Sequence, residues 1–171
     1  EFRRVLFRSQ SRLPVTQLIR TALPMTLELA LCGLVLGVIL GMALGLVTFH
    51  WRGGIVERVG ETLASLAQAI PEFLWGILLM LVVGLSLKLL SFIGPLDPHL
   101  IVPRVTGFLL IDTLLAGRPD AFVNRIEHLA LPVIAMAMIK VPVIMRLLRS
   151  SLVDVYAEEY VDSARLRGVG E

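Results

Sequence analysis

The 171-residue sequence lacks the side-chain patterns on which most enzymes and metal proteins depend. Its one cysteine, Cys32, lies inside an apolar run, forms no internal disulfide, and is interpreted as a packing residue. The three histidines lie far apart and show no metal-ligand spacing. No G-x-x-x-x-G-K-[ST] phosphate loop is present, so the chain does not bind ATP by that route. We therefore predict no catalytic residue, metal or cofactor on this chain.

Charge is scarce as well. The formal net charge is +2, and no basic stripe with interleaved aromatic residues predicts a nucleic-acid partner. Leu29–Phe49 runs for 21 residues without a charged side chain, which as a helix spans the roughly 30 Å core of a bilayer. A buried globular core would not need uncharged stretches of this length. We predict an all-α membrane protein, with lipid around it and spans at about 26–49, 62–87 and 129–148.

Polar and helix-breaking residues interrupt this pattern at two places. Pro71 and Glu72 fall inside the second span, which predicts a kink or a local opening of the helix there. A long connection, 91–128, then carries glycine, proline and scattered charge. Two short helices are expected within it, one at 107–116 and one at 121–128 with Asp120 as N-cap.

Two features of the spans indicate specific roles. Two charged residues, Glu72 and Lys140, lie at mid-membrane depth, where insertion costs ~2.5–3.5 kcal/mol, and such residues usually face protein or water. We expect them to lie within reach of each other or to line a translocation pathway, although each could instead snorkel or pair elsewhere. The first span also carries four glycines that are each four residues apart and so share one face of the helix, which predicts a helix-packing face. These glycines are Gly33, Gly37, Gly41 and Gly45.

The C-terminal tail is polar. From Leu152 to Arg167 the apolar residues recur at steps of three and four, acids come first and arginines last, and Gly168 follows. This pattern predicts a short amphipathic helix that lies against another surface. Its four acidic residues argue against anionic headgroups, so a protein partner is favoured. Lysine and arginine residues divide evenly between the two sides of the membrane, so their number does not determine the orientation of the spans. The basic residues of the compact tail alone favour placing the tail in the cytoplasm.

The first nine residues, EFRRVLFRS, match the translation of a common sequencing-adapter oligonucleotide. We interpret 1–9 as an artefact and 10–171 as a fragment of a longer permease domain, open at the N-terminus and truncated after Glu171.

The tail resembles the EAA-xxx-G loop of ABC importer permeases. Asp162-Ser163-Ala164, three residues and Gly168 match that motif, with Asp for Glu and Ser for the first Ala. Three upstream segments, TALPMTLELAL, IPEFLWGILLMLV and HLALPVIAMAM, are similar in order to the dipeptide/oligopeptide branch of the family. The resemblance covers about 20–171. It implies that Asp162, Ser163, Ala164 and Gly168 belong to a coupling helix that docks into an ATPase subunit.

The resemblance implies a membrane-spanning subunit of a bacterial inner-membrane importer for peptides or a similar small solute. The three spans would be the middle helices of a six-helix bundle that works by ATP-driven alternating access. The implied partners are a second permease subunit, two ATP-binding subunits that carry ATP and magnesium, and an extracytoplasmic solute-binding protein. The alternatives are a channel or gradient-driven transporter whose tail binds a regulator, and a membrane scaffold that transports nothing.

Overall fold

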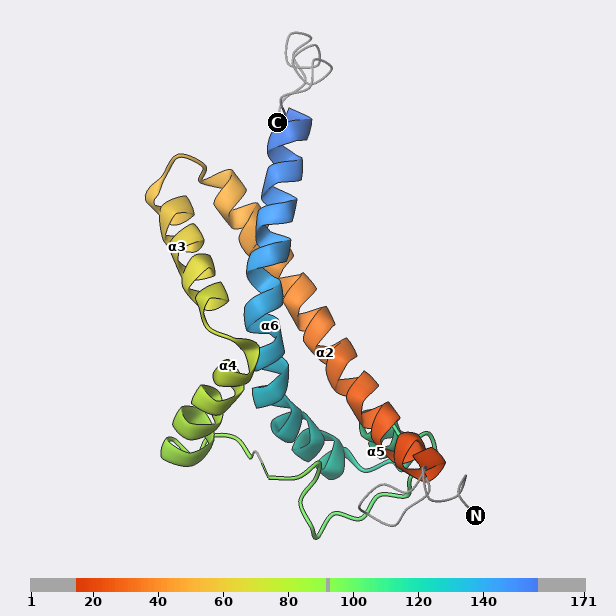
Figure 1. Ribbon diagram of the computed structural model, residues 1–171. Helices are drawn as coiled ribbons and strands as arrows, with labels where there is room; N and C mark the ends of the chain where they lie inside the picture. Colours follow the sequence, from red (N-terminus) through yellow and green to blue (C-terminus); the bar gives the residue numbers. More distant parts are fainter. Residues whose placement is uncertain (1–14, 92, 157–171) are drawn as a thin grey trace, which may run out of the picture. The chain divides into compact units, whose positions relative to one another are not determined.

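The computed structural model describes residues 15–91 and 93–156. Within these ranges the chain is helical and contains no strand (Figure 1). Two helices, α2 and α6, are long and apolar enough to cross a membrane, and a bent pair of shorter helices supplies a third span if it is counted as one. The prediction of an all-α chain with membrane spans is therefore confirmed for the part of the chain that is described.

Helix α2 comprises Val15–His50 and begins well before the predicted start of the first span at residue 26. The helix also contains Pro24, which lies two residues before the predicted start of the span. A proline removes one backbone hydrogen bond, and membrane helices tolerate this where neighbouring groups compensate. Thr26 Oγ1 donates to the carbonyl oxygen of Ala22 at 3.0 Å in the same turn.

The second span is broken, as its proline predicted. Helix α3, Ile55–Ala69, is followed by α4, Glu72–Leu79, and by a π-helical segment η1, Met80–Ser86. The helices on either side of the break are bent by 97°. Ile70 precedes Pro71 and adopts the extended backbone (φ −97°, ψ 125°) that a following proline imposes. Trp75 Nε1 donates to the Ala67 carbonyl oxygen at 2.9 Å and so satisfies a free carbonyl at the end of α3.

The connection contains one short helix, α5, at Leu109–Leu115. It lies within the predicted range 107–116 but begins two residues later. Gly107 is outside the helix because its φ is +87°, a conformation that an α-helix cannot contain. A Cβ at Gly107 would lie 3.0 Å from the Pro24 Cγ, so the glycine also allows this turn to pack closely on α2.

The second predicted short helix, 121–128, is wrong as a separate element. It forms the first turns of α6, which runs unbroken over Pro119–Tyr156 and includes the predicted third span 129–148. Pro119 occupies the first helical position, where its missing N–H costs no hydrogen bond. The prediction separated the two pieces because polarity changes at His128, but α6 continues across this change and through Pro132 without a break.

The chain divides into two compact units. Of the described residues, unit 1 comprises 15–32, 78–91 and 93–133, and unit 2 comprises 33–77 and 134–156. The first parts of α2 and α6 therefore belong to unit 1 and their second parts to unit 2. The buried apolar side chains of unit 1 include those of Leu109, Ala121, Leu129 and Leu131; those of unit 2 include Ala64, Ala67, Ala135, Ala137, Pro142 and Met145.

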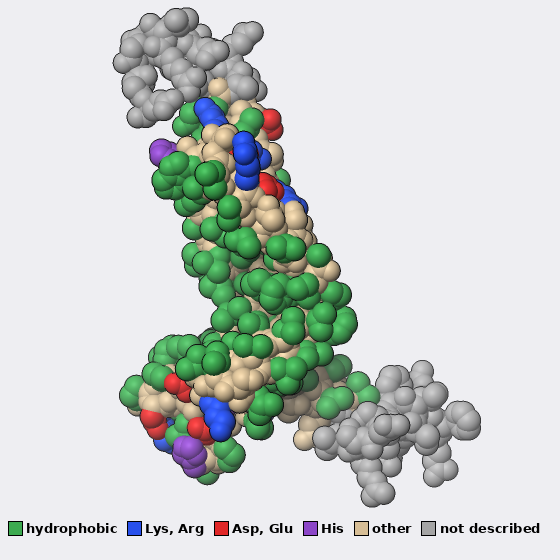
Figure 2. Space-filling view, turned by 90° about the vertical axis from the view of Figure 1, so that its left-hand side faces the viewer, with side chains coloured by type: hydrophobic (Ala, Val, Ile, Leu, Met, Phe, Trp, Pro, Cys, Tyr) green, Lys and Arg blue, Asp and Glu red, His purple; other side chains and the backbone are tan. Residues whose placement is uncertain are grey.

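Many large apolar side chains remain on the surface. Leu31, Val35 and Ile39 of α2 are each more than half exposed, and Figure 2 shows a face that is largely hydrophobic. Monomeric soluble proteins rarely expose apolar patches of this extent, whereas a bilayer or a neighbouring helix covers them in a membrane protein. The surface therefore agrees with the helix lengths in pointing to a membrane.

Candidate functional site

The four glycines of α2 lie on the face that packs on α6 in unit 2. All four are buried, and a Cβ at Gly33, Gly37 or Gly41 would lie 2.7–2.9 Å from a Cβ atom of α6. A Cβ at Gly45 would lie 3.0 Å from the backbone oxygen of Met145. Side chains at these positions would push the two helices apart. The contact is thus a close approach of two backbones of the kind that small residues permit in membranes.

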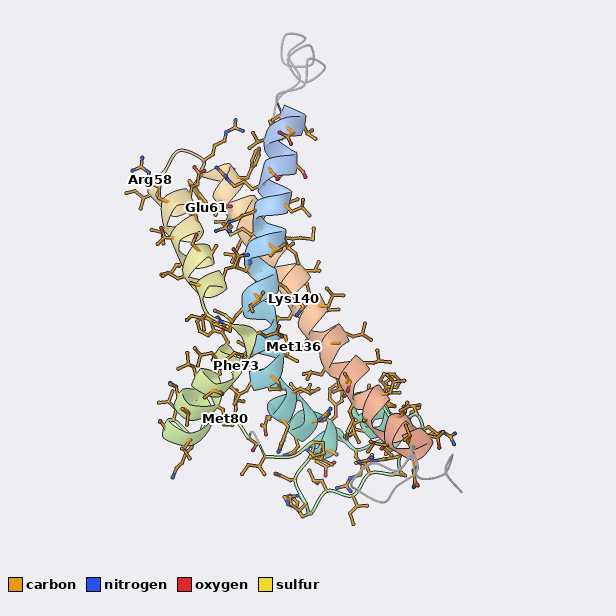
Figure 3. All side chains as sticks on the ribbon, viewed as in Figure 1. Arg58, Glu61, Phe73, Met80, Met136 and Lys140 are labelled. Atoms are coloured by element: carbon orange, nitrogen blue, oxygen red, sulfur yellow. The ribbon has the colours of Figure 1, made fainter. Side chains whose placement is uncertain are left out.

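Lys140 lies on α6 within this contact (Figure 3). A Cβ at Gly37 would meet the Lys140 Cβ at 2.9 Å, so the apolar stem of the lysine lies along the glycine face. Its ammonium group donates to the Met136 carbonyl oxygen at 3.2 Å, one turn back in the same helix. The side chain is half-buried and satisfies part of its hydrogen-bonding capacity locally.

Glu72 does not pair with Lys140. It is exposed in the first turn of α4 and has no polar side-chain partner among residues 15–91 and 93–156. The described residues thus provide no ion pair between the two intramembrane charges that the sequence singled out. Their role in a translocation pathway stays a prediction.

Two arginines of α6 hold α3 by a group of polar contacts that we call the α3–α6 clasp. Arg146 donates from Nε to Glu61 at 2.9 Å, from Nη2 to the Ser65 hydroxyl at 2.8 Å and from Nη1 to Gln68 at 2.6 Å. Arg149 forms an ion pair with Glu57 and lies 3.8 Å from Glu61. Figure 3 shows Glu61 on α3 near α6. The clasp fixes α3 against the C-terminal part of α6.

The last described turn of α6 is held by an aromatic contact. The rings of Phe49 and Tyr156 are 5.1 Å apart, and the Arg52 guanidinium carbon lies 5.0 Å and 5.8 Å from their centroids. Such cation–π contacts contribute on the order of 0.5–1 kcal/mol at exposed sites. They join the loop after α2 to the end of α6.

The predicted ATPase-docking residues follow directly in the chain. Asp162, Ser163, Ala164 and Gly168 lie outside the described residues. The structure describes the helix that precedes them in the chain. Helix α6 continues to Tyr156, and both the clasp and the aromatic contact hold its C-terminal end.

An apolar cavity of about 380 Å³ lies among α2, α3 and α6 of unit 2. Its described walls carry no charged side chain. Thr48 lines it, but its hydroxyl already donates to the carbonyl oxygens of Leu44 and Gly45. The lining of this cavity is therefore almost entirely apolar, and neither Glu72 nor Lys140 belongs to it.

Unit 1 holds a buried ion pair that no sequence pattern predicted. Arg125 Nε lies 3.2 Å from Glu28 Oε1, and their side chains are 6% and 4% exposed. Glu28 also accepts hydrogen bonds from the backbone N–H groups of Leu109 and Leu110, the first two residues of α5. Arg125 Nη1 donates to the Pro95 carbonyl oxygen at 2.8 Å. The pair thus connects α2 and α6 to the connection and to the N-terminus of α5.

One signal for this pair was present in the sequence. Glu28 is the single charge immediately before the 21-residue uncharged run, and an isolated acid at the edge of a span needs a partner. Its partner, 97 residues away, could not be identified by spacing.

Asp112 organises the turn before α5. Its carboxylate accepts hydrogen bonds from the Thr106 N–H and hydroxyl, both at 2.7 Å, and from the Gly107 N–H at 3.1 Å. Burial alone would raise the pKa of this carboxyl group, but the hydrogen bonds outweigh burial and hold the pKa below its ordinary value. Asp112 is therefore ionised at neutral pH and serves the loop as an internal acceptor.

Comparison with known proteins gives a consistent result. Residues 33–171 match the family described as "Binding-protein-dependent transport system inner membrane component". The dipeptide transport system permease protein DppB of Escherichia coli K12 is 31% identical over 163 residues, which are 94% of this chain and 48% of that protein. The di/tripeptide transport system permease protein DppB of Pseudomonas aeruginosa is 34% identical over 149 residues, 87% of this chain and 44% of that protein.

A third relative has a different named solute. The putrescine export system permease protein SapB of Escherichia coli K12 is 31% identical over 163 residues, 91% of this chain and 50% of that protein. The chain therefore spans about half the length of the curated relatives that it matches. The family is a transport component and not an enzyme.

The family match extends over most of the chain and confirms the resemblance that the ordered sequence segments predicted. The apolar helices α2 and α6 and the glycine contact between them are what a membrane-embedded bundle requires. The chain belongs to the family of binding-protein-dependent transport system inner membrane components.

Proposed function

We propose that this chain is part of the membrane-spanning subunit of a bacterial ABC importer that moves small peptides or similar solutes across the inner membrane. The observation that carries the proposal is the family match over 33–171. Two relatives named as dipeptide and di/tripeptide permeases support the solute class. The complete subunit is a bundle of about six helices, of which α2, the broken α3–α4–η1 span and α6 are three.

The mechanism is alternating access. A solute-binding protein delivers the solute to the side on which the 91–118 connection lies, and a second permease subunit completes the pathway. Two ATP-binding subunits close when they bind ATP and magnesium, and they move the segment after Tyr156. The residues of this segment that dock are Asp162, Ser163, Ala164 and Gly168. The clasp and the glycine contact then transmit the movement to α3 and α2, because both join rigid helices at close distance.

The docking proposal is tested with the complete permease, its ATP-binding subunits and its binding protein in proteoliposomes. Ala164→Trp and Gly168→Leu should each lower ATP-dependent peptide uptake at least about tenfold while ATP hydrolysis continues, because a bulky side chain holds the helix off its groove. Val153→Trp is the matched control, since Val153 is exposed on α6 within the described residues. Normal coupled uptake by both docking variants would contradict the assignment.

The alternative, a channel or a gradient-driven transporter, makes a different prediction in the same vesicles. Uptake would then proceed without ATP and would follow a solute or ion gradient. Substitutions in the tail would change regulation but not the coupling ratio.

A further inference from the structure

A polar cavity of about 380 Å³ in unit 1 belongs to none of the contacts described above. It lies at the end of η1, between the segment that follows this helix and the first turns of α6. It is lined by Gly84, Lys88, Leu89, Leu90, Ser91, Ile93, Asp97, Glu127 and His128. Its volume is within the range of small-molecule sites, about 300–1,000 Å³.

Two charged residues of opposite sign, both exposed, line this cavity without a partner among the described residues. Neither the Lys88 ammonium nor the Glu127 carboxylate has a hydrogen bond or an ion pair within the described part of the chain. Two other polar side chains of the lining, Asp97 and His128, are held in place. Asp97 accepts a hydrogen bond from Asn124 Nδ2 at 2.8 Å, and the buried His128 ring lies 3.6 Å from Asp97 and 2.8 Å from the Asn124 carbonyl oxygen. The cavity therefore has a fixed polar wall and two free charges.

The backbone around Lys88 is unusual. Lys88 has a φ of 51°, the one positive value for a non-glycine residue in the described ranges. It follows seven residues of π-helix, which usually occurs only as short insertions and is frequent at functional sites. Hydrogen bonds from the N–H of Leu87 to Val82 O and from the N–H of Leu89 to Val83 O hold this turn. A lysine kept in a disfavoured conformation by its surroundings is typical of a residue placed for binding.

We propose that this cavity binds the two charged termini of a small peptide, with Lys88 facing the carboxylate and Glu127 the ammonium group. The inference rests on the proposed function, because it concerns the solute of the same transporter. A carboxylate and an ammonium separated by a short neutral body match a cavity that is lined by one unpaired cation, one unpaired anion and the apolar side chains of Leu89 and Ile93. Zwitterionic headgroups of phosphatidylethanolamine share this chemistry, and the experiment separates the two sources.

The test measures binding of tritiated Ala-Ala to the complete transporter in phosphatidylcholine nanodiscs, without the solute-binding protein, so that its selectivity does not contribute. N-acetyl-Ala-Ala and Ala-Ala amide compete as ligands that lack one terminal charge. Each should bind the wild type about tenfold more weakly than Ala-Ala, the lower range expected for a lost hydrogen bond to a charged group.

The variants remove one partner each. Lys88→Asn eliminates the cation while keeping a residue that tolerates positive φ. It should lose the preference for Ala-Ala over the amide and keep the preference over the N-acetyl peptide. Glu127→Gln should show the reverse pattern. Lys88→Arg should restore the wild-type pattern, and Arg104→Met, an exposed cation of the same connection that does not line the cavity, should not change it.

Three outcomes would overturn the inference. The first is that Lys88→Asn and Glu127→Gln keep the wild-type preference for Ala-Ala over both blocked peptides. This outcome leaves the proposed function intact, because the wild type still binds Ala-Ala. The second is loss of peptide binding when phosphatidylethanolamine replaces phosphatidylcholine, which identifies a lipid headgroup as the occupant. The third is absence of Ala-Ala binding to the wild type. ATP-dependent peptide uptake by the same preparation with its binding protein then decides whether the proposed function fails as well.

Discussion

Helices α2 and α6 contact each other in both units, but by opposite means. In unit 1 the contact depends on a buried ion pair, Glu28–Arg125, whose groups also bind the backbone of the connection. In unit 2 it depends on the absence of side chains, because four glycines let the backbones approach. An ion pair fixes one orientation and tolerates no loss of a partner. A glycine face is defined by shape alone and tolerates no added atom.

The largest expected effect comes from breaking the ion pair on one side. Arg125→Met leaves the Glu28 carboxylate buried without its cation and should destabilise the permease by about 3–5 kcal/mol. Thermal unfolding of the complete permease in detergent measures this loss. The double variant Glu28→Gln with Arg125→Met should recover much of the stability, since no charge then remains unpaired. Equal losses in the single and double variants would mean that the pair does not act as a unit.

A smaller effect is expected in unit 2. At Gly41 a Cβ would lie 2.7 Å from the Ile144 Cβ, so Gly41→Leu should force α2 and α6 apart and cost about 1–3 kcal/mol. Gly76→Leu is the matched control, because a Cβ there meets nothing within 4 Å. The same unfolding assay and the yield of assembled transporter compare the two. Equal behaviour of the two leucine variants would show that the glycine contact does not determine stability.

The two contacts also differ in how far the sequence predicts them. A four-residue period is local, so the glycine face and the break at Pro71 follow from helix geometry and from the sterics of a residue before proline. The ion pair joins residues 97 positions apart, and only the fold brings them together. The clasp is similar, since Arg146 and Glu61 are 85 positions apart. Local pattern thus predicted helices and faces, but not their partners.

The predicted helix bounds were wrong where a change in polarity was taken as the end of a helix. Residues 15–25 and 119–128 are more polar than the spans, yet both are helical and extend α2 and α6. Backbone hydrogen bonding continues across a change of solvent, so a helix ends at a conformational break and not at the membrane edge. The prediction that Glu72 and Lys140 lie within reach of each other or line a pathway was based on their depth in the membrane. Depth alone does not reveal which face of a helix a residue occupies.

The smallest expected effect concerns the α3–α6 clasp, whose charges are partly exposed. Arg146 and Glu61 side chains are 38% and 31% exposed, so their coupling should amount to about 0.2–1 kcal/mol. Arg146→Glu and Glu61→Arg should each lower the melting temperature, because each places like charges opposite one another. The double variant, Arg146→Glu with Glu61→Arg, should recover part of the loss. The control Arg58→Glu should have little effect, since Arg58 is exposed on α3 without a side-chain partner in the described ranges (Figure 3). Strictly additive losses in this double-mutant cycle would contradict a direct interaction between Arg146 and Glu61.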